Sequence, residues 1–274
     1  MVPGLDTDAE NQAHQGGGCR LCNGEVRLQF SIPVLERHTV EYSSCLFCGS
    51  LQTEPPYWLK DAYQHNLAIL DTGAAQRNLA NLSAAVVVAR LLGARDLVDF
   101  GGGDGLLCRL LRDHGLNCFV EDKYAKASYA LGFTRPDFEK PELLLAFEVL
   151  EHFENPQRDL QTLFQSKPRA LLASTVPYDT QGSDWWYLTP ETGQHVFFYS
   201  RAAMRLIAER WGFDVVGQGY YWLFVKSGTF GGVKKALARM LLTRPILRLV
   251  GALLRLMPTP AVTRDFDSLR SRKR

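Results

Sequence analysis

The sequence has 274 residues, of which 46% are hydrophobic and 22% charged, and its formal net charge at pH 7 is +2. This composition is typical of a globular protein that is long enough for one α/β domain, a small module and a tail. A charge so close to zero gives no overall field for nucleic acid, and no apolar run reaches the length of a transmembrane helix.

The N-terminal residues 1–18 are polar and rich in glycine. They lack the apolar stretch of a signal peptide, and such a composition predicts a disordered leader. We therefore expect a cytoplasmic protein, in which thiols stay reduced. Paired cysteines in such a protein indicate a metal site more often than a disulfide.

Two C-x-x-C pairs follow the leader: Cys19 with Cys22, and Cys45 with Cys48. Each pair places two thiolates on one tight turn, so that together they predict a tetrahedral Cys₄ zinc site. The apolar residues between the pairs predict a small hairpin. We expect a zinc ribbon over residues 19–60, in which the zinc is structural because four thiolates leave no open coordination position.

Residues 51–60 form a proline-marked junction in which Tyr57 and Trp58 are expected to be exposed. The apolar spacing of residues 74–92 then predicts a helix that covers a sheet and ends at Gly93.

Residues 96–122 form the pattern around which the rest of the chain is organised. An apolar run ends at Phe100, a glycine-rich turn opens a helix, and a second apolar run ends at Asp122. This is a β-α-β unit, in which a ligand can approach the backbone at the N-terminus of the helix.

The turn has the form Asp99-x-Gly101-x-Gly103-x-Gly105. Its carboxylates would repel a pyrophosphate but suit a ligand that carries an ammonium group. S-adenosylmethionine is such a ligand, because it has an amino acid end, a sulfonium and a ribose but no phosphate. Asp99 is expected near the amino group, and Asp122, at the tip of the second strand, is placed to accept hydrogen bonds from the ribose hydroxyls.

An acid followed by G-x-G-x-G resembles the first motif of the class I S-adenosylmethionine-dependent methyltransferases. The resemblance implies a Rossmann-like α/β fold over residues 61–226, with a mostly parallel sheet of seven strands whose last strand is antiparallel. The third strand and the adenine-contacting loop are then expected in residues 132–142.

Residues 143–147 predict a buried strand, and the run F-E-V-L-E-H with Asn155-Pro156 follows it. This run closely resembles the motif after the fourth strand in a methyltransferase group that includes the ubiquinone-type O-methyltransferases. Phe147 and Glu148 are therefore expected to line the cofactor site. Two interpretations of His152 stay open, as a catalytic base or as a helix-capping and packing residue.

The long loop of residues 177–194 follows a predicted helix at 159–165 and a predicted strand at 170–176. It contains Trp185, Trp186 and Tyr187 and lies where a substrate lid would be. The alternative is that these aromatic side chains only anchor a long loop to the protein.

His195-Val196-Phe197-Phe198-Tyr199-Ser200 is predicted to open the next helix, residues 202–211, and residues 212–216 and 220–226 a closing strand pair. A zinc ribbon, a methyltransferase domain and a helix entered in this way resemble bacterial sugar-nucleotide C-methyltransferases. In that family a Y-H-E-H segment supplies a histidine base. The matching residues here are Thr192-Gly193-Gln194-His195, so the resemblance implies His195 as the base, with Gln194 in place of the carboxylate.

The remaining residues, 227–274, are basic and amphipathic. Within residues 233–257, Arg244, Arg248 and Arg255 fall on one helical face. The opposite face is apolar and consists of Ile246, Leu249, Val250, Leu253, Leu254 and Leu256. Two interpretations stay open: a helix on the anionic inner surface of a membrane, or a helix that covers the sheet or a partner subunit. Residues 271–274 are expected to be solvated.

These patterns predict an enzyme that transfers a methyl group from S-adenosyl-L-methionine to a small-molecule acceptor, a sugar or a glycan-pathway intermediate. His195 and His152 are the candidate bases. Two other functions stay open: an RNA or protein methyltransferase that uses the ribbon and basic tail, and a non-catalytic S-adenosylmethionine-binding scaffold. No N-P-P-Y motif follows the fourth strand, and no basic patch with interleaved aromatic residues indicates nucleic acid.

Overall fold

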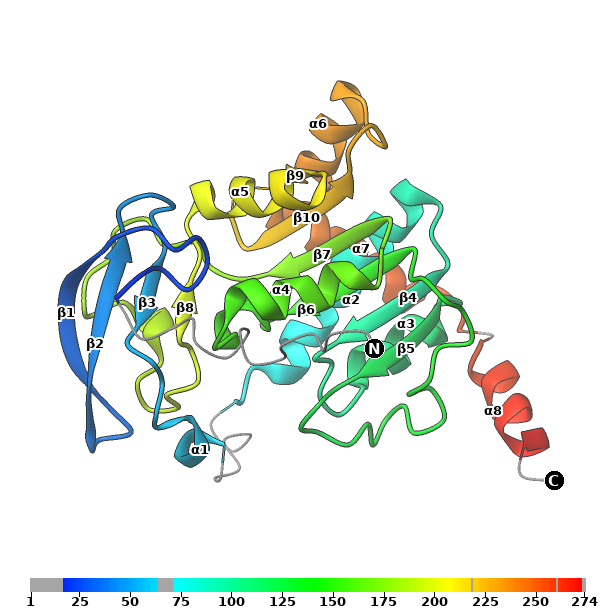
Figure 1. Cartoon of the computed structure of the whole chain (residues 1–274). Helices are drawn as coiled ribbons and strands as arrows, with labels where there is room; N and C mark the ends of the chain where they lie inside the picture. Colours follow the sequence, from blue (N-terminus) through cyan, green and yellow to red (C-terminus); the bar gives the residue numbers. More distant parts are fainter. Residues whose placement is uncertain (1–16, 64–70, 218, 260, 273–274) are drawn as a thin grey trace, which may run out of the picture.

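The computed structural model describes residues 17–63, 71–217, 219–259 and 261–272. The expected leader therefore lies largely outside the described residues. Two sheets organise the chain: a four-stranded sheet in the order β1-β2-β3-β8, and a six-stranded sheet in the order β5-β4-β6-β7-β10-β9 (Figure 1). The small sheet lies at one side of the large one.

The large sheet has the mixed topology that the sequence predicts. Four neighbouring strands are parallel to one another: β4 (Asp96–Phe100), β5 (Asn117–Glu121), β6 (Leu143–Phe147) and β7 (Ala170–Ser174). The closing strands are β9 (Phe213–Val216) and β10 (Tyr221–Lys226), and β10 is antiparallel to both of its neighbours. Every residue of β6 and β7 is buried, because helices cover both faces of the sheet.

The expected third strand is absent from the described residues 123–142, so the prediction of seven strands is wrong by one. Only a single ladder-like bond, from the Val120 amide to the Phe133 carbonyl (2.9 Å), forms at this edge of the sheet. Pro136 and Pro141 each lack the N–H that a continued strand would need. Instead, the rings of Phe133 and Phe138 pack edge-on against Phe119 of β5.

Helices cover the two faces of the large sheet. One face carries α2 (Ala74–Leu92), α3 (Leu106–Asp113), α6 (Gly232–Leu241) and α7 (Arg244–Leu256), and the other carries α4 (Pro156–Gln165) and α5 (Arg201–Trp211). The predicted bounds of α2 and its end at Gly93 are confirmed. Residues 81–89 of α2 are buried on all sides, because α7 packs over its outer face.

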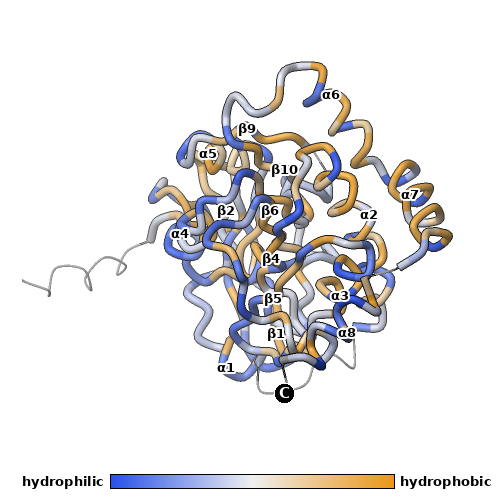
Figure 2. Tube along the Cα trace, turned by 90° about the vertical axis from the view of Figure 1, so that its right-hand side faces the viewer, coloured by the Kyte–Doolittle hydropathy of each residue, from blue (hydrophilic) through white to orange (hydrophobic). Residues whose placement is uncertain are grey.

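The basic tail forms α6 and α7, separated near Pro245, and then a further helix that the sequence did not indicate, α8 (Ala261–Arg272). Figure 2 shows α7 outside α2, with hydrophobic and hydrophilic residues in alternation. No single described helix is long and apolar enough to cross a membrane, although α7 and α8 taken together, bent by 65°, reach that length and composition. Residues 271–274 were expected to be solvated; the first two of them are the last residues of α8, and Ser271 is exposed.

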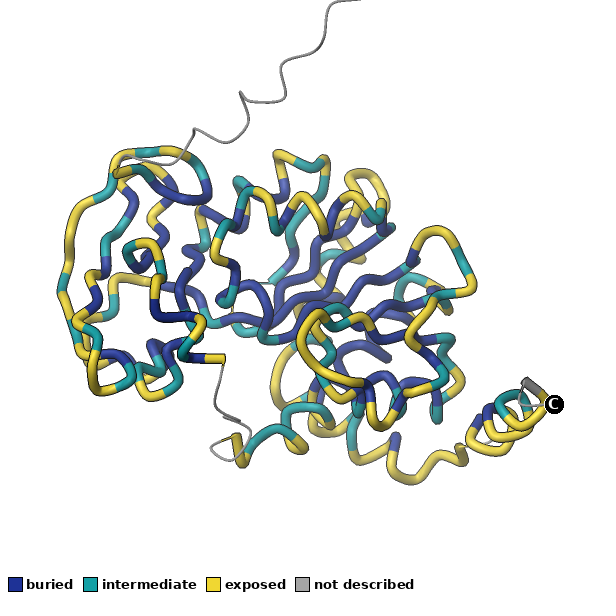
Figure 3. Tube along the Cα trace, turned by 60° about the horizontal axis from the view of Figure 1, so that its bottom comes forward, coloured by how far each residue is buried: buried dark blue, intermediate teal, exposed yellow. Residues whose placement is uncertain are grey.

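The apolar face of α7 is divided between the protein interior and the solvent. Leu247 and Leu254 are buried against α2, and Gly251 crosses it so closely that a Cβ there would lie 3.0 Å from Oγ of Ser83. Leu249 and Leu253 are more than half exposed. Figure 3 shows the exposed residues of the chain, in yellow, around a buried interior. The prediction that α7 covers the protein is therefore met by only one part of its apolar face.

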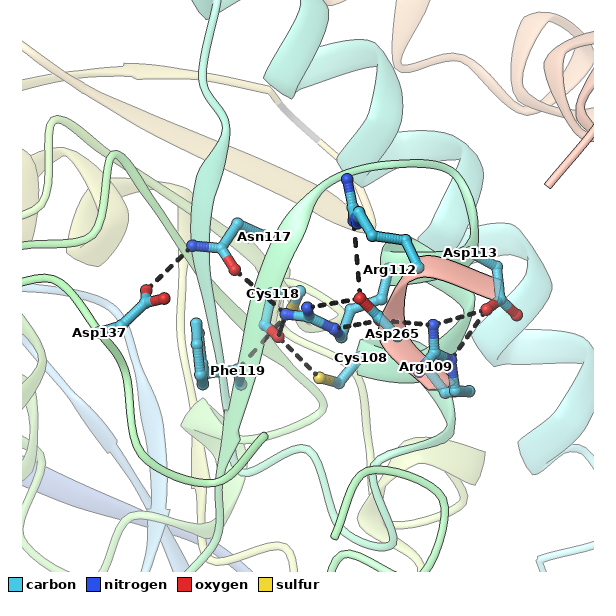
Figure 4. A network of polar contacts seen from close by, with 10 residues as sticks. Cys108, Arg109, Arg112, Asp113, Asn117, Cys118, Phe119, Asp137 and Asp265 are labelled. Carbon is cyan, nitrogen blue, oxygen red and sulfur yellow. Dashed lines mark hydrogen bonds and ion pairs between the residues drawn. The ribbon is translucent and has the colours of Figure 1, made fainter. Parts of the chain in front are cut away.

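The helix α8 is attached to α3 through a buried ion pair (Figure 4). The Asp265 carboxylate accepts hydrogen bonds from Arg112 at Nε (2.7 Å) and Nη2 (3.0 Å), and another from Arg109 (2.9 Å). The Arg112 guanidinium also lies 3.5 Å from the centre of the Phe133 ring. Charge, hydrogen bonds and stacking thus hold α8 against α3, the helix that follows the glycine turn.

The small sheet contains the predicted hairpin, β1 (Val26–Val34) and β2 (His38–Cys45), together with β3 (Leu51–Thr53) and β8 (Phe197–Phe198). β8 pairs with β3, although it lies more than 140 residues later in the chain. The expectation that His195–Ser200 opens a helix is therefore wrong for its first part. Helix α5 begins only after Ser200, whose hydroxyl caps it by accepting from the Ala203 amide.

Besides the cores on the two faces of the large sheet, a hydrophobic core lies between the small sheet and the long loop of residues 177–194. Trp58, which follows β3 and precedes α1 (Leu59–Ala62), is buried, and its Nε1 donates to the Gly193 carbonyl (2.8 Å). The expectation that Trp58 is exposed is thus wrong, because this loop folds over it; Tyr57 is exposed as expected. The ribbon and the loop consequently share one core.

Candidate active site

The glycine turn connects β4 to α3 with three residues in the left-handed region: Gly101, Gly103 and Gly105 have φ of 68°, 59° and 81°. A side chain at Gly101 would place Cβ 2.6 Å from Cγ2 of Val149. One at Gly102 would place Cβ 2.4 Å from the Asp99 carboxylate. Only glycine therefore lets this turn pass between the end of β6 and the acid of β4.

Asp99 lies beneath the turn and is almost fully buried, with 2% of its surface exposed. Its Oδ2 has no hydrogen-bond partner among the described residues. Burial, followed by the negative charges of Asp122 and Asp104, raises the pKa of Asp99 to about 7. A cationic group on a ligand would relieve both effects.

Asp122, directly after β5, connects the second strand to the turn. Its Oδ2 accepts a hydrogen bond from the Gly103 amide (3.0 Å), and its Oδ1 accepts from the amides of Tyr124 and Ala125 (2.7 Å each). The carboxylate is half-buried. Oδ1 already accepts two bonds, but Oδ2 accepts only one and can accept another, so a ligand hydroxyl could still bind there.

Phe147 and Glu148 end β6 beside the turn, as the sequence predicts for neighbouring strand ends. Glu148 has a positive φ of 53°, a conformation that non-glycine residues adopt mainly where the surroundings impose it. Its Oε1 accepts a hydrogen bond from the Ser174 hydroxyl (2.8 Å), and its amide donates to the same hydroxyl oxygen (3.0 Å). Burial raises the pKa of the Glu148 carboxyl.

The two candidate histidines lie together, although 43 positions separate them in the sequence. His152 ends the short 3₁₀ helix η2 (Leu150–His152), and His195 precedes β8. Their ring centres are 4.9 Å apart and nearly perpendicular. Burial lowers the pKa of His152 to about 4, and burial together with the charge of His152 lowers that of His195 to about 3. Both imidazoles are therefore neutral near pH 7.

The protonated nitrogen of His195 follows from its contact. Its Nδ1 lies 2.7 Å from the Tyr187 carbonyl oxygen, which can only accept, so Nδ1 carries the hydrogen. Nε2 then has a free lone pair. This is the tautomer that a general base requires.

Glu151 completes this group, which we term the histidine cluster: Glu151, His152 and His195. One donor atom from each residue lies within 4.8 Å of the other two, so that the three could also hold a metal ion. Glu151 is fully buried, and its Oε1 accepts from the Tyr187 hydroxyl (2.6 Å). Oε2 of Glu151 and Nδ1 of His152 have no partner among the described residues. Glu151 is part of the F-E-V-L-E-H run, but the sequence analysis did not single it out.

The long loop of residues 177–194, which we call the aromatic loop, is anchored to the protein as the second interpretation of it predicts. Trp185 and Tyr187 are buried and anchor it, whereas Trp186 is 71% exposed. Trp186 packs edge-on against Tyr187, whose ring in turn lies 4.7 Å from that of His195. An exposed indole thus lies one residue away from the histidine cluster.

A groove with a volume of about 1250 Å³ begins at Glu148, Trp186 and Tyr220 and continues between α2 and the helices α6 and α7. Its wall includes five arginines: Arg77, Arg239, Arg244, Arg248 and Arg255. The sequence indicated a basic face on α7, but not that this face lines a groove which leads to the end of β6.

The four paired cysteines converge as predicted. The sulfur atoms of Cys19 and Cys48 are 3.6 Å apart and those of Cys22 and Cys45 are 3.5 Å apart, and all four lie within 4.8 Å of one another without a disulfide. Tetrahedral zinc with Zn–S bonds of about 2.3 Å would separate its sulfurs by about 3.8 Å. The four thiols therefore fit a zinc ion after small adjustments.

Arg20, between the first two of these cysteines, was missed by the sequence analysis. Its buried guanidinium donates to the carbonyls of Glu154 (3.0 Å), Thr53 (3.1 Å) and Val196 (2.5 Å). Val196 directly follows His195, and Glu154 lies two residues after His152. The first cysteine turn is thus attached to both segments that carry the histidines.

The chain is similar to known methyltransferases. A family model described as a methyltransferase domain matches residues 62–218. No curated protein matches the sequence. Similar solved structures include magnesium protoporphyrin IX methyltransferase from Synechocystis PCC 6803 with bound SAH (20% identity, TM-score 0.43, covering 62% of this chain and 93% of that one).

Two further similar structures are the mitomycin 7-O-methyltransferase (16% identity, TM-score 0.45, covering 61% of this chain and 59% of that one) and the methyltransferase domain of bacterial CtHen1-C (19%, 0.40, 54% and 98%). The family model covers more than half of this chain, including the glycine turn and the strand ends on both sides of it. The chain therefore belongs to this methyltransferase-domain family, and it is an S-adenosylmethionine-dependent methyltransferase.

Proposed function

We propose that this enzyme methylates a small-molecule acceptor, a sugar or a glycan-pathway intermediate, and that His195 removes the acceptor's proton. The observation that carries the proposal is the histidine cluster: two neutral imidazoles, one with a free Nε2, directly after the strand end that borders the glycine turn. Methyl transfer needs alignment of the reacting groups and, for a weak nucleophile such as a hydroxyl, a base.

S-adenosylmethionine supplies an electrophilic methyl group on its sulfonium. Around it, the residues of the chain have separable roles. The Asp99 carboxylate receives the ammonium group, the turn at Gly101, Gly103 and Gly105 lets the ligand approach the backbone, and Asp122 accepts the ribose hydroxyls. Phe147 and Glu148 form the wall at the end of β6. These roles agree with the burial of Asp99 and the remaining acceptor capacity of Asp122.

A sugar acceptor is supported by the side chains around the cluster. The exposed indole of Trp186 offers a flat apolar surface for a sugar ring, and it leads through Tyr187 to His195. His195 Nε2 accepts the proton from the acceptor, while the Tyr187 carbonyl holds Nδ1–H and so fixes the tautomer. His152 packs at right angles against His195 and limits its rotation.

We assign to the zinc a structural role only. Cys19, Cys22, Cys45 and Cys48 would hold it, and amides of Phe47 and Cys48 donate to the Cys45 sulfur (3.4 Å each), which suits a metal-bound thiolate. Burial and the hydrogen bond from Cys19 act in opposite directions on Cys48, and the hydrogen bond is larger, so the pKa of the Cys48 thiol falls to about 5. The ribbon would then support the histidine cluster through Arg20.

The test is the variant His195→Ala, with His38→Ala as a matched control because His38 lies on the ribbon, away from the cluster. Each protein is incubated with labelled S-adenosylmethionine and a panel of free sugars, nucleotide sugars and lipid-linked sugars. We expect His195→Ala to lower turnover about 100-fold or more with unchanged S-adenosylmethionine affinity, and His38→Ala to retain both. At saturating S-adenosylmethionine, wild-type turnover should not fall between about pH 8 and pH 5, because the histidine pKa values lie below that window.

Three outcomes would contradict the proposal. Binding of S-adenosylmethionine without transfer to any acceptor would favour a scaffold protein. Salt-dependent retention of RNA, with methylation of that RNA, would favour a nucleic-acid substrate. Loss of turnover on chelation, restored by a divalent cation while the ribbon stays folded, would show that the histidine cluster holds a metal ion rather than acting directly as the base.

A further inference from the structure

The groove between α2 and α7 has an unusual combination of cationic and apolar walls. Arg244, Arg248 and Arg255 follow one face of α7 at intervals of one or two turns and line it. The apolar part of the lining comes from leucines of α2, α3 and α7 and of the turn after α6: Leu79, Leu82, Leu110, Leu242, Leu247 and Leu254. A ligand that fills the groove must therefore carry both negative charge and apolar surface.

The charge of the groove is not neutralised by the protein. Among the residues that the structure describes, no carboxylate lies within 4 Å of Arg239, Arg244, Arg248 or Arg255. The fifth arginine, Arg77, is paired with Asp71, and the one acid in the lining is Glu148. Four unpaired guanidiniums along one groove match a phosphate or pyrophosphate, which arginine binds with its planar fork of donors.

The helices α6 and α7 also carry exposed apolar side chains. The exposed fractions are 59% for Leu249, 54% for Leu253 and 83% for Leu256 on α7, and 87% for Val233 and 53% for Met240 on α6. We call these five residues the outer apolar face. Exposed apolar side chains such as these, beside basic side chains, suit the interface of an anionic bilayer.

We propose that the groove binds a lipid-linked phosphate, and that this lipid carries the acceptor. The apolar chain lies along the leucines, the phosphate contacts Arg244 and Arg248, and the group to be methylated reaches Glu148 and the histidine cluster. The outer apolar face places the mouth of the groove at the membrane surface where such a lipid resides. This inference rests on the proposed function, since it names the class of acceptor for the same site.

The test measures binding of the full chain to three kinds of vesicle: phosphatidylcholine alone, phosphatidylcholine with phosphatidylglycerol, and phosphatidylcholine with a polyprenyl monophosphate. We expect the strongest binding to the third. The double variant Arg244→Gln/Arg248→Gln should lose that preference by about tenfold or more, as for removed charge-assisted hydrogen bonds. The matched variant Leu253→Ser/Leu256→Ser changes exposed positions only, so the fold should be kept while binding to all three vesicles falls by a similar factor.

Several results would overturn the inference. One is equal binding of the wild type to polyprenyl phosphate and phosphatidylglycerol, which would show a general membrane surface rather than a site. A second is unchanged preference in Arg244→Gln/Arg248→Gln. A third is displacement of the lipid by inorganic phosphate or a nucleotide sugar at similar concentration, which would indicate a soluble anion.

The inference and the proposed function fail separately. Lipid binding is measured without S-adenosylmethionine and should persist in His195→Ala, so a protein that binds the lipid but methylates nothing would refute only the enzyme mechanism. Conversely, methylation of a soluble sugar that is unaffected by Arg244→Gln/Arg248→Gln would refute only the lipid-linked acceptor.

Discussion

Asp99 carries a charge that the folded protein does not solvate. The carboxylate lies under the glycine turn with one oxygen unpartnered, and burial raises its pKa to about 7 from an ordinary value near 4. The buried charge destabilises the protein without a ligand, and a cationic ligand would offset that cost. A buried carboxylate of this kind is more readily explained by binding than by folding.

Replacing Asp99 by asparagine should separate the effect of this carboxyl on stability from its effect on ligand binding. Because the folded pKa is raised, the folded state holds a proton that the unfolded state has lost between about pH 4 and pH 7, so the stability contributed by this group falls as pH rises through that window. Asp99→Asn should therefore raise the free energy of unfolding at pH 8, by up to about 4 kcal/mol, since a tenfold change in an equilibrium constant corresponds to about 1.4 kcal/mol. Urea unfolding at pH 5 and pH 8 measures it.

The same variant should bind S-adenosylmethionine more weakly, because it lacks the negative charge for the ammonium group. In the wild type, affinity should fall about tenfold between pH 8 and pH 6 as Asp99 becomes protonated. Calorimetry at both pH values checks this. Asp104→Asn is the matched control, because it changes an exposed acid of the same turn, and it should keep the wild-type affinity at pH 8. Equal affinity of Asp99→Asn and wild type at pH 8 would refute the role of Asp99.

At the scale of elements, the small sheet is attached to the segment that carries His195. β8 completes the small sheet immediately after His195, and the Arg20 guanidinium bonds to the Val196 carbonyl. The position of His195 therefore depends on elements near the N-terminus. If His195 is the base, as we propose, the cysteine cluster should affect turnover although it lies outside the groove.

Loss of the zinc should accordingly reduce turnover while S-adenosylmethionine still binds. We expect about one zinc per chain in the wild type and a protease-sensitive ribbon in Cys45→Ser, because structural zinc sites couple metal binding to folding. Cys108→Ser is the matched control, since Cys108 is a buried cysteine of α3 outside the cluster. Metal analysis, limited proteolysis and turnover are compared. A metal-free wild type with a protease-resistant ribbon would contradict this prediction.

At the scale of the whole molecule, segments far apart in the sequence close the fold at both ends. β8 brings the middle of the chain to the ribbon, and α8 brings the C-terminus to α3, the helix that follows the glycine turn (Figure 1). The contact between β3 and β8 crosses the domain boundary expected at residue 60, and the contact between α3 and α8 crosses the one expected at residue 226.

Breaking the ion pair beneath α8 should release that helix. Asp265→Asn leaves the Arg112 guanidinium buried without its carboxylate, and removing one partner of a buried pair typically costs about 3–5 kcal/mol. Asp113→Asn, which removes a more exposed partner of Arg109, should cost about 1 kcal/mol or less. Thermal unfolding and proteolysis of the C-terminus distinguish the two.

The pH dependence of the same contact has the opposite sign to that of Asp99. Burial alone would raise the pKa of Asp265, but hydrogen bonds from Arg112 and Arg109 outweigh it and lower that pKa. The stabilisation is therefore present above the ordinary aspartate pKa near 4 and is lost as pH falls through the lower folded value. An unchanged unfolding temperature in Asp265→Asn at neutral pH would show that α8 does not depend on this pair.

The sequence by itself determined the local features of this protein. The acid and glycine spacing at Asp99–Gly105 specified a strand, a turn and a helix, and the two C-x-x-C pairs specified a thiol cluster. These predictions depend on neighbouring residues, because turn conformation, helical periodicity and side-chain alternation are properties of short segments.

The tertiary structure alone decided the features that depend on residues far apart in the chain. The pairing of β8 with β3, the meeting of His152 with His195, the burial of Trp58 and the orientation of the α7 arginines into a groove all require packing between distant elements. A short segment such as Phe197–Phe198 has no periodicity that distinguishes a strand from the start of a helix. Its partner strand makes that choice, because only the partner satisfies its backbone hydrogen bonds.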